Sequence, residues 1–599
     1  MNLESLDIKQ QKLNELKNIF PEIFEDETIN YEKLKTILDD SIEESKTEHY
    51  SFEWFGKKDC YKTIKAKTNA TLKVDDDKDM PDGNNVFIEG DNLEVLKLLQ
   101  HSYHKKVKMI YIDPPYNKDK DFVYKDSWSD TIMNYKIQTD QLRDEGYTST
   151  KTTSTGRRHT NWLNMIYPRL WLSRNLLKDD GVIFVSIDDD EVHNLRKVMD
   201  EIYGEENFVG DVIRKTKSMT ADKNTGFNFQ HEYLLIYAKN KQQIILKGEE
   251  KDLSKYQNSD SDIKGDWVSG DPSAKSGGKS TNFPIKNPYT NKVDYPPNGR
   301  YWAFSETSLN KYIKDGKIKF KEQYLDNERG FIFKRYKDEL DSQYNSFHSL
   351  FSIENKFMNQ IGTKELKELF GQELFDNPKP VEFIKKLIQY TTDGNDIILD
   401  FFAGSGTTAH AVMEINQNDE KNRKYILVQL PEAIEKNKFN KISDITKFRL
   451  TEVIKKLDYK DGFKSFYLDD SNFQVFKEVK KRPNESLEDI EKLLKMSIFH
   501  ENILTQNCKE LDLVYEIGLK NGFSLSAKNE EIKTEKYNFI RLYENDDEGI
   551  REFYFCFDKK IQNDIIKDIP KECKLICYEK SLNDSIKLNL HTNIDLETL

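Results

Sequence analysis

The sequence has little cysteine, no long apolar run and no excess of basic residues. Its five cysteines are scattered over 599 residues, and only Cys573 and Cys577, in CKLIC, lie close together. Their alternation with apolar residues favours packing in a core over metal binding. The sequence therefore supports neither a disulfide framework nor a zinc site.

The remaining absences concern membranes and charge. No apolar run approaches the length that crosses a bilayer, and the first twenty residues alternate acidic, basic and apolar positions without a signal peptide's apolar core. We therefore expect a cytoplasmic protein with no membrane partner. The net charge of −13 argues against a protein that coats nucleic acid nonspecifically, although it leaves room for a local basic cleft.

What is present is a strand–helix alternation in two blocks. In NVFIEGDNLEVLKLLQHSYHKKVKMIYIDPPYN, strands at Val86–Ile88 and Val107–Ile112 flank a helix near Leu93–Leu99, which is the pattern of a βαβ unit. A further helix in NWLNMIYPRLWLSRNLL and a strand at Val182–Ile187 follow a polar stretch, YTSTKTTSTGRRHT, typical of a mobile loop. The alternation resumes with strands at Ile397–Phe401 and Tyr425–Leu430.

Between the two blocks the composition changes to glycine, proline, serine, asparagine and aromatics, as in SGDPSAKSGGKSTNFPIKNPYTN. This change predicts an inserted domain. Leucine and isoleucine at helical spacing predict a helical segment at the N-terminus, and mixed helix and strand patterns predict a separate module at the C-terminus. The predicted divisions are 1–48 (helical segment), 49–240 (first α/β block), 241–371 (inserted domain), 372–470 (second α/β block) and 471–599 (C-terminal α+β module).

The stretch YIDPPYN, 111–117, directly follows the apolar run VKMIYI. Because proline lacks a backbone N–H, Pro114 and Pro115 must end this strand's hydrogen bonding, which puts Asp113 and Tyr116 at its carboxyl end. In an open parallel sheet, ligands bind at that edge. The turn is therefore a candidate active site, and the alternative is a loop merely capped by proline.

A second candidate is DFFAGSGTTAHA, where Asp400 closes a strand before two glycines and a helix start. Glycines let the backbone approach a ligand closely, and a helix N-terminus offers free N–H groups. A phosphate-binding loop would have lysine where Thr407 stands, and a dinucleotide loop would have glycine at Ala409. What remains is a loop suited to a nucleoside with an uncharged or zwitterionic tail.

Together the two motifs resemble those of DNA amino-methyltransferases that use S-adenosylmethionine, whose catalytic motif is [DNS]-PP-[YFW]. The order of motifs is similar to that of the circularly permuted β class. Long stretches also look like the modification subunit of type III restriction-modification systems, among them VFIEGDNLEVLKLL, HTNWLNMIYPRL, HEYLLIYAKN, NPKPVEFIKKLI and FFAGSGTTAHAV. The resemblance covers about residues 84–240 and 375–475 and implies a permuted Rossmann-like fold, with 241–371 as a target-recognition domain.

The resemblance implies methyl transfer to adenine N6 in duplex DNA. An exocyclic amine is a poor nucleophile, so the catalyst must hold acceptors at its hydrogens. The carboxylate of Asp113 and the main-chain carbonyl of Pro114 suit this task, Pro115 stiffens the turn, and Tyr116 can stack on a base swung out of the duplex. No covalent enzyme intermediate and no metal are needed.

For the cofactor, the resemblance assigns the loop to the methionine and ribose region and NPKP to the methionine carboxylate. It places Asp91 near the adenine of the cofactor. A ribose-binding glutamate common in the class is replaced by Gln429, with Glu432 further on, so the ribose ligand stays open. The expected cofactor residues are Asp91, Asn377, Lys379, Pro380, Asp400, Phe402, Ala403, Gly404, Ser405, Gly406, Thr407, Thr408 and Gln429.

Several alternatives stay open from the sequence. Cytosine N4 suits the same geometry as adenine N6, and RNA is a weaker third substrate. The chain lacks a G-x-x-x-x-G-K-[ST] loop, so DNA cleavage would need a partner ATP-dependent helicase-nuclease; an orphan regulator would have none. The resemblance also implies a homodimer. Possible phosphate contacts are Arg157, Arg158, Arg214, Lys215 and Lys217, and an acidic run that favours a helix start over a metal site is Asp188, Asp189 and Asp190.

Overall fold

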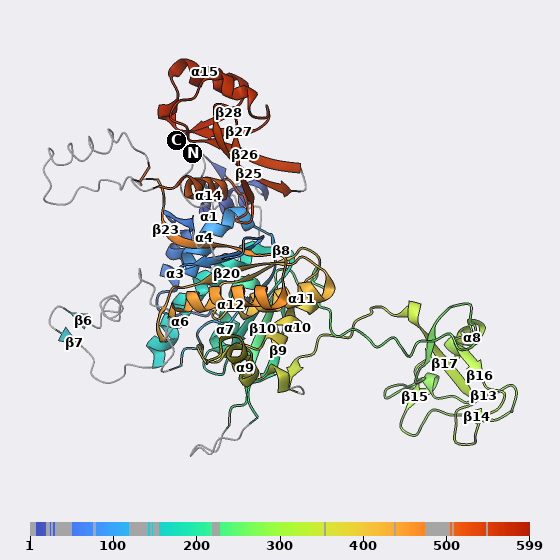
Figure 1. Ribbon diagram of the computed structural model, residues 1–599. Coiled ribbons are helices and arrows are strands. Elements are labelled where there is room, and N and C mark those ends of the chain that lie inside the picture. The colour runs from blue at the N-terminus through green and yellow to red at the C-terminus, as the bar shows by residue number, and fades with distance from the viewer. Residues whose placement is uncertain are drawn as a thin grey trace. The chain divides into compact units, whose positions relative to one another are not determined.

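The protein is described here by a computed structural model (Figure 1). It describes residues 7–19, 24–25, 28–29, 51–75, 80–118, 142–143, 146–147, 155–218, 228–352, 355–436, 439–473, 504–505, 508–546 and 549–599. The middle of the polar stretch, 148–154, and the side chain of Arg157 lie outside these residues.

The chain divides into two compact units. The main unit comprises residues 1–245 and 348–599, and the second unit comprises residues 246–347. The second unit therefore lies wholly within the composition change noted at 241–371, while the segment after 347 returns to the main unit, where β18 (Leu350–Phe351) pairs with β9 (Phe208–Lys215).

A ten-stranded mixed sheet forms the centre of the main unit (Figure 1). All neighbouring strands from β8 to β23 run parallel, whereas β10 and β3 are antiparallel to their neighbours. The strands in spatial order are β18, β9, β10 (His231–Ala238), β8 (Leu177–Ile187), β5 (Val107–Ile112), β19 (Ile397–Asp400), β20 (Lys424–Gln429), β4 (Asn85–Glu89), β23 (Phe463–Asp470) and β3 (Ala70–Val74).

Helices cover both faces of this sheet, because its central strands are apolar on both sides. Ile110 and Ile112 of β5 belong to a core shared with Leu163 and Leu170, while Tyr111 between them contacts the ring of Phe383 on the opposite side. The helices near the first core are α3 (Lys57–Lys65), α4 (Asn92–Tyr103), α6 (Thr155–Leu176), α7 (Val192–Tyr203) and α14 (Glu510–Lys520), and those of the other layer are α10 (Val381–Thr391), α11 (Thr407–Asp419) and α12 (Ile442–Leu457).

Smaller elements surround this core. A five-stranded sheet near the C-terminus contains β24 (Lys528–Lys533), β25 (Asn538–Asp546), β26 (Gly549–Cys556), β27 (Lys574–Cys577) and β28 (Asp595–Thr598), and α15 (Asp584–Asn593) packs with it. In the second unit, β11 (Trp267–Ser269), β17 (Phe331–Tyr336) and β16 (Ile318–Phe320) form one sheet, beside the hairpins β12 (Ser273–Ala274) with β15 (Tyr301–Trp302) and β13 (Ile285–Lys286) with β14 (Val293–Asp294), and helix α8 (Glu306–Lys314).

The predicted strands of both α/β blocks are confirmed, with β5 at the predicted bounds and β8 beginning earlier, at Leu177. The helical prediction for the N-terminus holds for α1 (Ile8–Ile19) but is wrong for Phe24–Glu25 and Thr28–Ile29, which form an antiparallel hairpin. Pro21 explains the difference, since proline disfavours a continuing helix. Cys573 and Cys577 are buried in the core, as predicted.

None of the helices among the described residues is long and apolar enough to span a bilayer. What positions the candidate site is the central parallel part of the sheet. There β5 lies directly beside β19, so the segments that follow these two strands, far apart in the sequence, leave the sheet at the same edge.

Candidate active site

The two sequence motifs meet at one edge of the sheet. β5 ends at Ile112, so Asp113 opens the turn 113–116, here called the DPPY turn. β19 ends at Asp400, before the segment 402–408, here called the GSG loop. Since β5 and β19 are parallel neighbours, both segments emerge at their carboxyl ends, where ligands bind in open α/β sheets.

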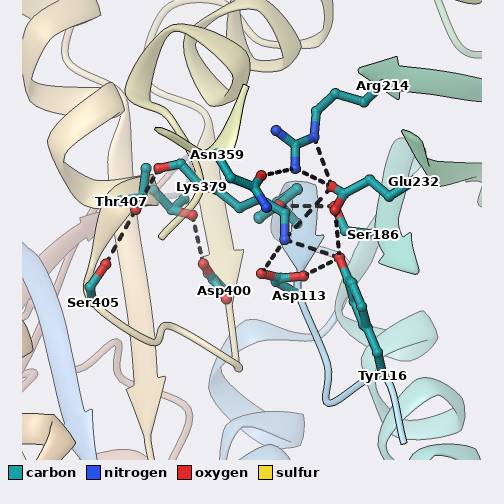
Figure 2. Close-up of polar contacts among 12 residues, drawn as sticks. Asp113, Tyr116, Ser186, Arg214, Glu232, Asn359, Lys379, Asp400, Ser405 and Thr407 are labelled. Carbon is teal, nitrogen blue, oxygen red and sulfur yellow. Dashed lines mark hydrogen bonds and ion pairs between the residues drawn. The ribbon is translucent and has the colours of Figure 1, made fainter. Parts of the chain in front are cut away.

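In the DPPY turn, both carboxylate oxygens of Asp113 accept hydrogen bonds (Figure 2). The hydroxyl of Tyr116 lies 2.8 Å from Oδ1, and the Nζ of Lys379 lies 2.6 Å from Oδ2. Lys379 also donates to the Tyr116 hydroxyl across 3.0 Å. Lys379, which the resemblance assigned to the cofactor, is therefore in direct contact with the DPPY turn.

A buried ion pair lies behind Tyr116. Glu232 of β10 accepts from the Tyr116 hydroxyl at 3.2 Å and from the guanidinium of Arg214, on β9, at 2.7 Å. Arg214 is fully buried, and it donates also to the carbonyl of Phe357 and to Oδ1 of Asn359. Arg214 thus cannot contact a DNA phosphate, so that prediction is wrong: a cation within the sheet needs a buried partner, and Glu232 supplies it.

The neighbouring charges keep Glu232 ionised and the phenol of Tyr116 neutral. Burial disfavours the Glu232 carboxylate, but Arg214 and Lys379 hold its pKa below the usual value. Burial, together with the charges of Asp113 and Glu232, raises the pKa of Tyr116 well above its usual value. The Tyr116 hydroxyl therefore keeps its proton and acts as a hydrogen-bond donor.

The other end of the turn is held by the helix α6. The indole Nε1 of Trp162 donates to the carbonyl of Pro115 across 2.7 Å. Asn117 adopts a left-handed conformation, with φ of 61°, and its amide donates to the buried carboxylate of Glu191 at 2.5 Å. Glu191 also contacts Nδ1 of His159, on α6, at 2.6 Å. The turn is thus fixed on both sides.

Asp400 holds the GSG loop through two hydrogen bonds to its carboxylate. Its Oδ1 accepts from the backbone N–H of Phe402 at 3.0 Å, and its Oδ2 accepts from the hydroxyl of Thr408 at 2.6 Å. Burial raises the pKa of Asp400 to about 7, although these two hydrogen bonds oppose the shift. Asp400 therefore supports the loop from inside the protein.

Two glycines give the loop its path. Gly404 and Gly406 have φ of 52° and 80°, a region that residues with a side chain rarely occupy. A Cβ at Gly404 would lie 3.2 Å from the ring of Phe375. The N–H of Gly404 donates to Oε1 of Gln429 at 2.7 Å, so the side chain that the resemblance placed near the ribose is engaged with the loop itself.

Arg449 of α12 holds the loop from behind. Its guanidinium donates to the hydroxyls of Ser405 and Thr407, each at 2.9 Å, and burial lowers its pKa to about 10. The Thr407 hydroxyl in turn donates to the main-chain carbonyl of Lys379 at 3.3 Å. The GSG loop and the residue that contacts Asp113 are thereby joined through one hydroxyl.

The remaining expected cofactor residues lie around the loop. Asp91 caps α4 by accepting from the N–H groups of Leu93 and Glu94, and it pairs with Arg169 at 3.1 Å, so both of its oxygens are engaged. Pro380 immediately precedes α10 as its N-cap. Ala403 is buried within the loop, and Asn377, three positions before Pro380, has φ of 50°.

Three residues of this network are not among the predicted site residues, namely Glu232, Trp162 and Arg449, and Arg214 was predicted in another role, as a phosphate contact. The signal that could have found Arg214 and Glu232 is a charge inside an otherwise apolar strand, in VIRKT and HEYLLIY. Arg449 sits among the buried positions Ile445 and Val453 of α12, at helical spacing. A charged residue on an apolar face requires a buried partner.

The acidic run 188–190 precedes the helix α7. Asp188 pairs with Lys118 at 2.5 Å, and its Oδ1 accepts from the N–H of Asp190 at 3.1 Å. Across the part of the chain that the structure describes, no group of three or more histidine, cysteine, aspartate or glutamate side chains is arranged to hold a metal ion.

Comparison with known proteins places these features in a family. The family model described as DNA methylase matches residues 107–439, which include the DPPY turn, the second unit and the GSG loop. The chain is 36% identical over 433 residues to the type III restriction-modification enzyme StyLTI Mod subunit of Salmonella typhimurium, covering 69% of this chain and 64% of that protein.

The EcoPI Mod subunit of Escherichia phage P1, also named as type III, is 34% identical over 496 residues, covering 74% of each chain. Among solved structures, the M1.HpyAVI-SAM complex is similar with a TM-score of 0.27 and 14% identity, covering 61% of this chain and 98% of that one. For the StyLTI Mod subunit of Salmonella typhimurium, the matched segment covers slightly less than two thirds of that protein's length.

Proposed function

The chain belongs to the DNA methylase family and, within it, to the Mod subunits of type III restriction-modification enzymes, and from this premise we propose that it methylates adenine N6 in duplex DNA with S-adenosylmethionine. The observation that carries the proposal is the adjacency of β5 and β19, which brings the Asp113 carboxylate and the GSG loop to one edge of the sheet.

The residues of the DPPY turn supply what an exocyclic amine needs. The carboxylate of Asp113 accepts hydrogen bonds from the amino group and so directs the nitrogen lone pair toward the methyl donor. As the nitrogen forms its new bond to the methyl carbon, the bond from that carbon to sulfur would break, sulfur would leave as a neutral thioether, and one proton of the nitrogen would pass to Asp113. Tyr116, stiffened by the two prolines before it, stacks on the extruded base and offsets the cost of unstacking it.

The donors of the GSG loop suit S-adenosylmethionine better than a phosphate ligand. The loop carries hydroxyls and backbone amides, its glycines keep the backbone open, and Thr407 stands where a phosphate loop has lysine. When bound, S-adenosylmethionine supplies an electrophilic methyl group on a sulfonium. Phe402–Thr408 would hold the methionine and ribose part of the cofactor. Lys379, which contacts both Asp113 of the turn and Thr407 of the loop, would neutralise the cofactor's carboxylate.

We also assign target recognition to the second unit, 246–347, which interrupts the methylase region as a compact body of its own. In chain order the DPPY turn precedes this unit and the GSG loop follows it, in keeping with a circularly permuted methyltransferase. A homodimer, and a separate helicase-nuclease subunit that cleaves DNA, complete the proposal. Replacing 246–347 by the equivalent segment of a relative should change the methylated sequence and leave the reaction unchanged.

One experiment tests the activity and the base together. The purified chain is incubated with duplex DNA and S-adenosylmethionine labelled in its methyl group, and the nucleosides are then separated by mass spectrometry. We expect label in N6-methyldeoxyadenosine. Label in N4-methyldeoxycytidine would overturn the adenine assignment alone, and label only in an RNA substrate would overturn DNA as the substrate. Long-read mapping of the product gives the sequence context.

A further inference from the structure

The Tyr116 hydroxyl has one proton and two acceptors. It lies 2.8 Å from Oδ1 of Asp113 and 3.2 Å from Oε2 of Glu232 (Figure 2). A phenol can donate to only one of them at a time. The hydrogen bonds of Tyr116 to Asp113 and to Glu232 are therefore alternatives, and the proton can pass from one acceptor to the other by rotation of the O–H bond.

Lys379 has the same two neighbours. Its Nζ lies 2.6 Å from Oδ2 of Asp113 and 3.7 Å from Oε1 of Glu232. A small rotation of a lysine side chain covers the difference between these distances. Both groups that occupy Asp113 thus have the Glu232 carboxylate as their second acceptor, on the side away from the GSG loop.

The Glu232 carboxylate is fixed in position by its own contacts. It is nearly fully buried and bound to Arg214 at 2.7 Å. Arg214 is anchored in turn by Oδ1 of Asn359 at 2.6 Å and by the carbonyl of Phe357, and its guanidinium lies 5.1 Å from the ring of Phe383. The acceptor is therefore held in place, whereas each of the two donors has a second acceptor nearby.

We propose that Glu232 is a positioning residue that takes over the Tyr116 hydroxyl and the Lys379 ammonium when Asp113 binds the amino group of the target base. The role rests on the proposed methyl transfer. With both donors on Asp113, its negative charge is shared and its oxygens are partly occupied. With the donors on Glu232, Asp113 presents its full charge to the amino hydrogens, and Arg214 balances the charge of Glu232.

The first test is Glu232→Gln, which keeps the shape and one carbonyl acceptor but removes the negative charge. Lys379 then has Asp113 as its anionic partner in this cluster. We expect single-turnover methylation, at saturating DNA and S-adenosylmethionine, to slow by about 10- to 100-fold, the usual worth of a hydrogen bond to a charged group. The dissociation constant of DNA stays unchanged, because Glu232 is buried away from the duplex.

A Tyr116→Phe background separates this role from a structural one. Phenylalanine keeps the stacking ring but removes one of the two donors that Glu232 receives. We therefore expect Glu232→Gln to slow the Tyr116→Phe enzyme by a smaller factor than it slows the wild type. Equal factors in the two backgrounds would mean that Glu232 acts independently of Tyr116 and would overturn the proposal.

Two further variants control for folding. Glu516→Gln neutralises another buried carboxylate, which pairs with Lys520 at 2.6 Å in the C-terminal part of the chain, and should leave the single-turnover rate within about twofold of wild type. The double variant Arg214→Gln with Glu232→Gln replaces the ion pair by two neutral amides and leaves no buried charge unpaired. It should remain as slow as Glu232→Gln, with thermal unfolding measured beside it.

The outcomes distinguish this role from the proposed function. A wild type that methylates DNA while Glu232→Gln, or the double variant, methylates equally fast would overturn the role of Glu232 and leave the proposed function standing. A folded wild type that transfers no methyl group to any duplex would overturn the proposed function and this role together.

Discussion

The DPPY turn and the GSG loop lie at the same sheet edge but differ in how far along the chain their hydrogen-bonding partners lie. The side chains that hold the GSG loop come from nearby in the chain: Gln429 is 25 positions from Gly404, and Arg449 is 44 positions from Ser405. Those that hold the DPPY turn include Trp162, which is 47 positions from Pro115, but also much more distant residues: Glu232 is 116 and Lys379 is 263 positions from Tyr116.

The two segments differ in charge as well. The bonds around the GSG loop are mostly neutral, to hydroxyls, an amide and backbone groups, with Arg449 as a cation behind it. The DPPY turn sits in a cluster of two carboxylates, a lysine and an arginine. A loop held locally can bind its ligand with its immediate surroundings intact, whereas the turn depends on the assembled sheet. Substitutions should therefore separate binding from the chemical step.

The largest expected effect is that of Asp113→Ala, which removes the acceptor for the amino group. Methyl transfer should fall by about 10³-fold or more, a typical loss for a group that acts on the reacting atoms. Binding of S-adenosylmethionine, measured by calorimetry, should remain. Asp113→Asn serves as the matched variant, since it keeps the shape of the side chain. Near-wild-type methylation by either variant would contradict the role of Asp113.

Gly406→Val should impair the GSG loop. Gly406 has φ of 80°, and a Cβ there would lie 3.1 Å from Cγ2 of Thr446, so a branched side chain strains and displaces the loop. We expect affinity for S-adenosylmethionine to fall by about 100-fold, at a strain cost of about 1–3 kcal/mol. Gly210→Ala is the control, because nothing lies within 4 Å of a Cβ at Gly210 and its φ is not positive. Unchanged cofactor affinity in Gly406→Val would contradict the loop's role.

Asp400→Asn should change how the stability of the protein depends on pH. Because burial raises the pKa of Asp400 from 3.8 to about 7, the folded chain keeps a proton there that the unfolded chain releases between these values. Asp400 therefore lowers stability as the pH rises from about 4 to about 7. In denaturant titrations, the variant should gain about 3 kcal/mol on the wild type across this window. A difference that is independent of pH would show that Asp400 is already ionised at pH 4.

The smallest expected effect is that of Trp162→Phe, which removes the hydrogen bond to the Pro115 carbonyl. The loss should cost about 1 kcal/mol of stability and slow methyl transfer by about 10-fold, with cofactor binding unchanged. Trp54→Phe is the matched control: the Trp54 indole donates to Oδ1 of Asn164 at 2.7 Å, outside the DPPY turn. Equal slowing in both variants would show a general effect on folding.

Local patterns were enough to place the main elements of the α/β blocks. The strand Val107–Ile112 was predicted at the bounds it has, because its apolar run ends at two prolines, and the glycines before Thr407 marked the turn into α11. The predicted N-terminal helical segment was wrong at Phe24–Glu25 and Thr28–Ile29, because proline, here Pro21, disfavours a continuing helix even where apolar residues keep helical spacing. The pairing of Arg214 with Glu232 was out of reach, because nothing in one sequence tells which of many charges lie on adjoining strands.

The acid–proline turn, the glycine loop and their order around an inserted segment, predicted at 241–371, can be recognised from the sequence alone. Their side chains and backbone conformations are local properties, so a few neighbouring residues suffice to specify them. Folding is what brings β5 beside β19, Lys379 onto Asp113, and Glu232, paired with Arg214, onto Tyr116. The physical reason is that strand order and buried charge pairing depend on packing between distant segments, which bring their partners together only in the folded sheet.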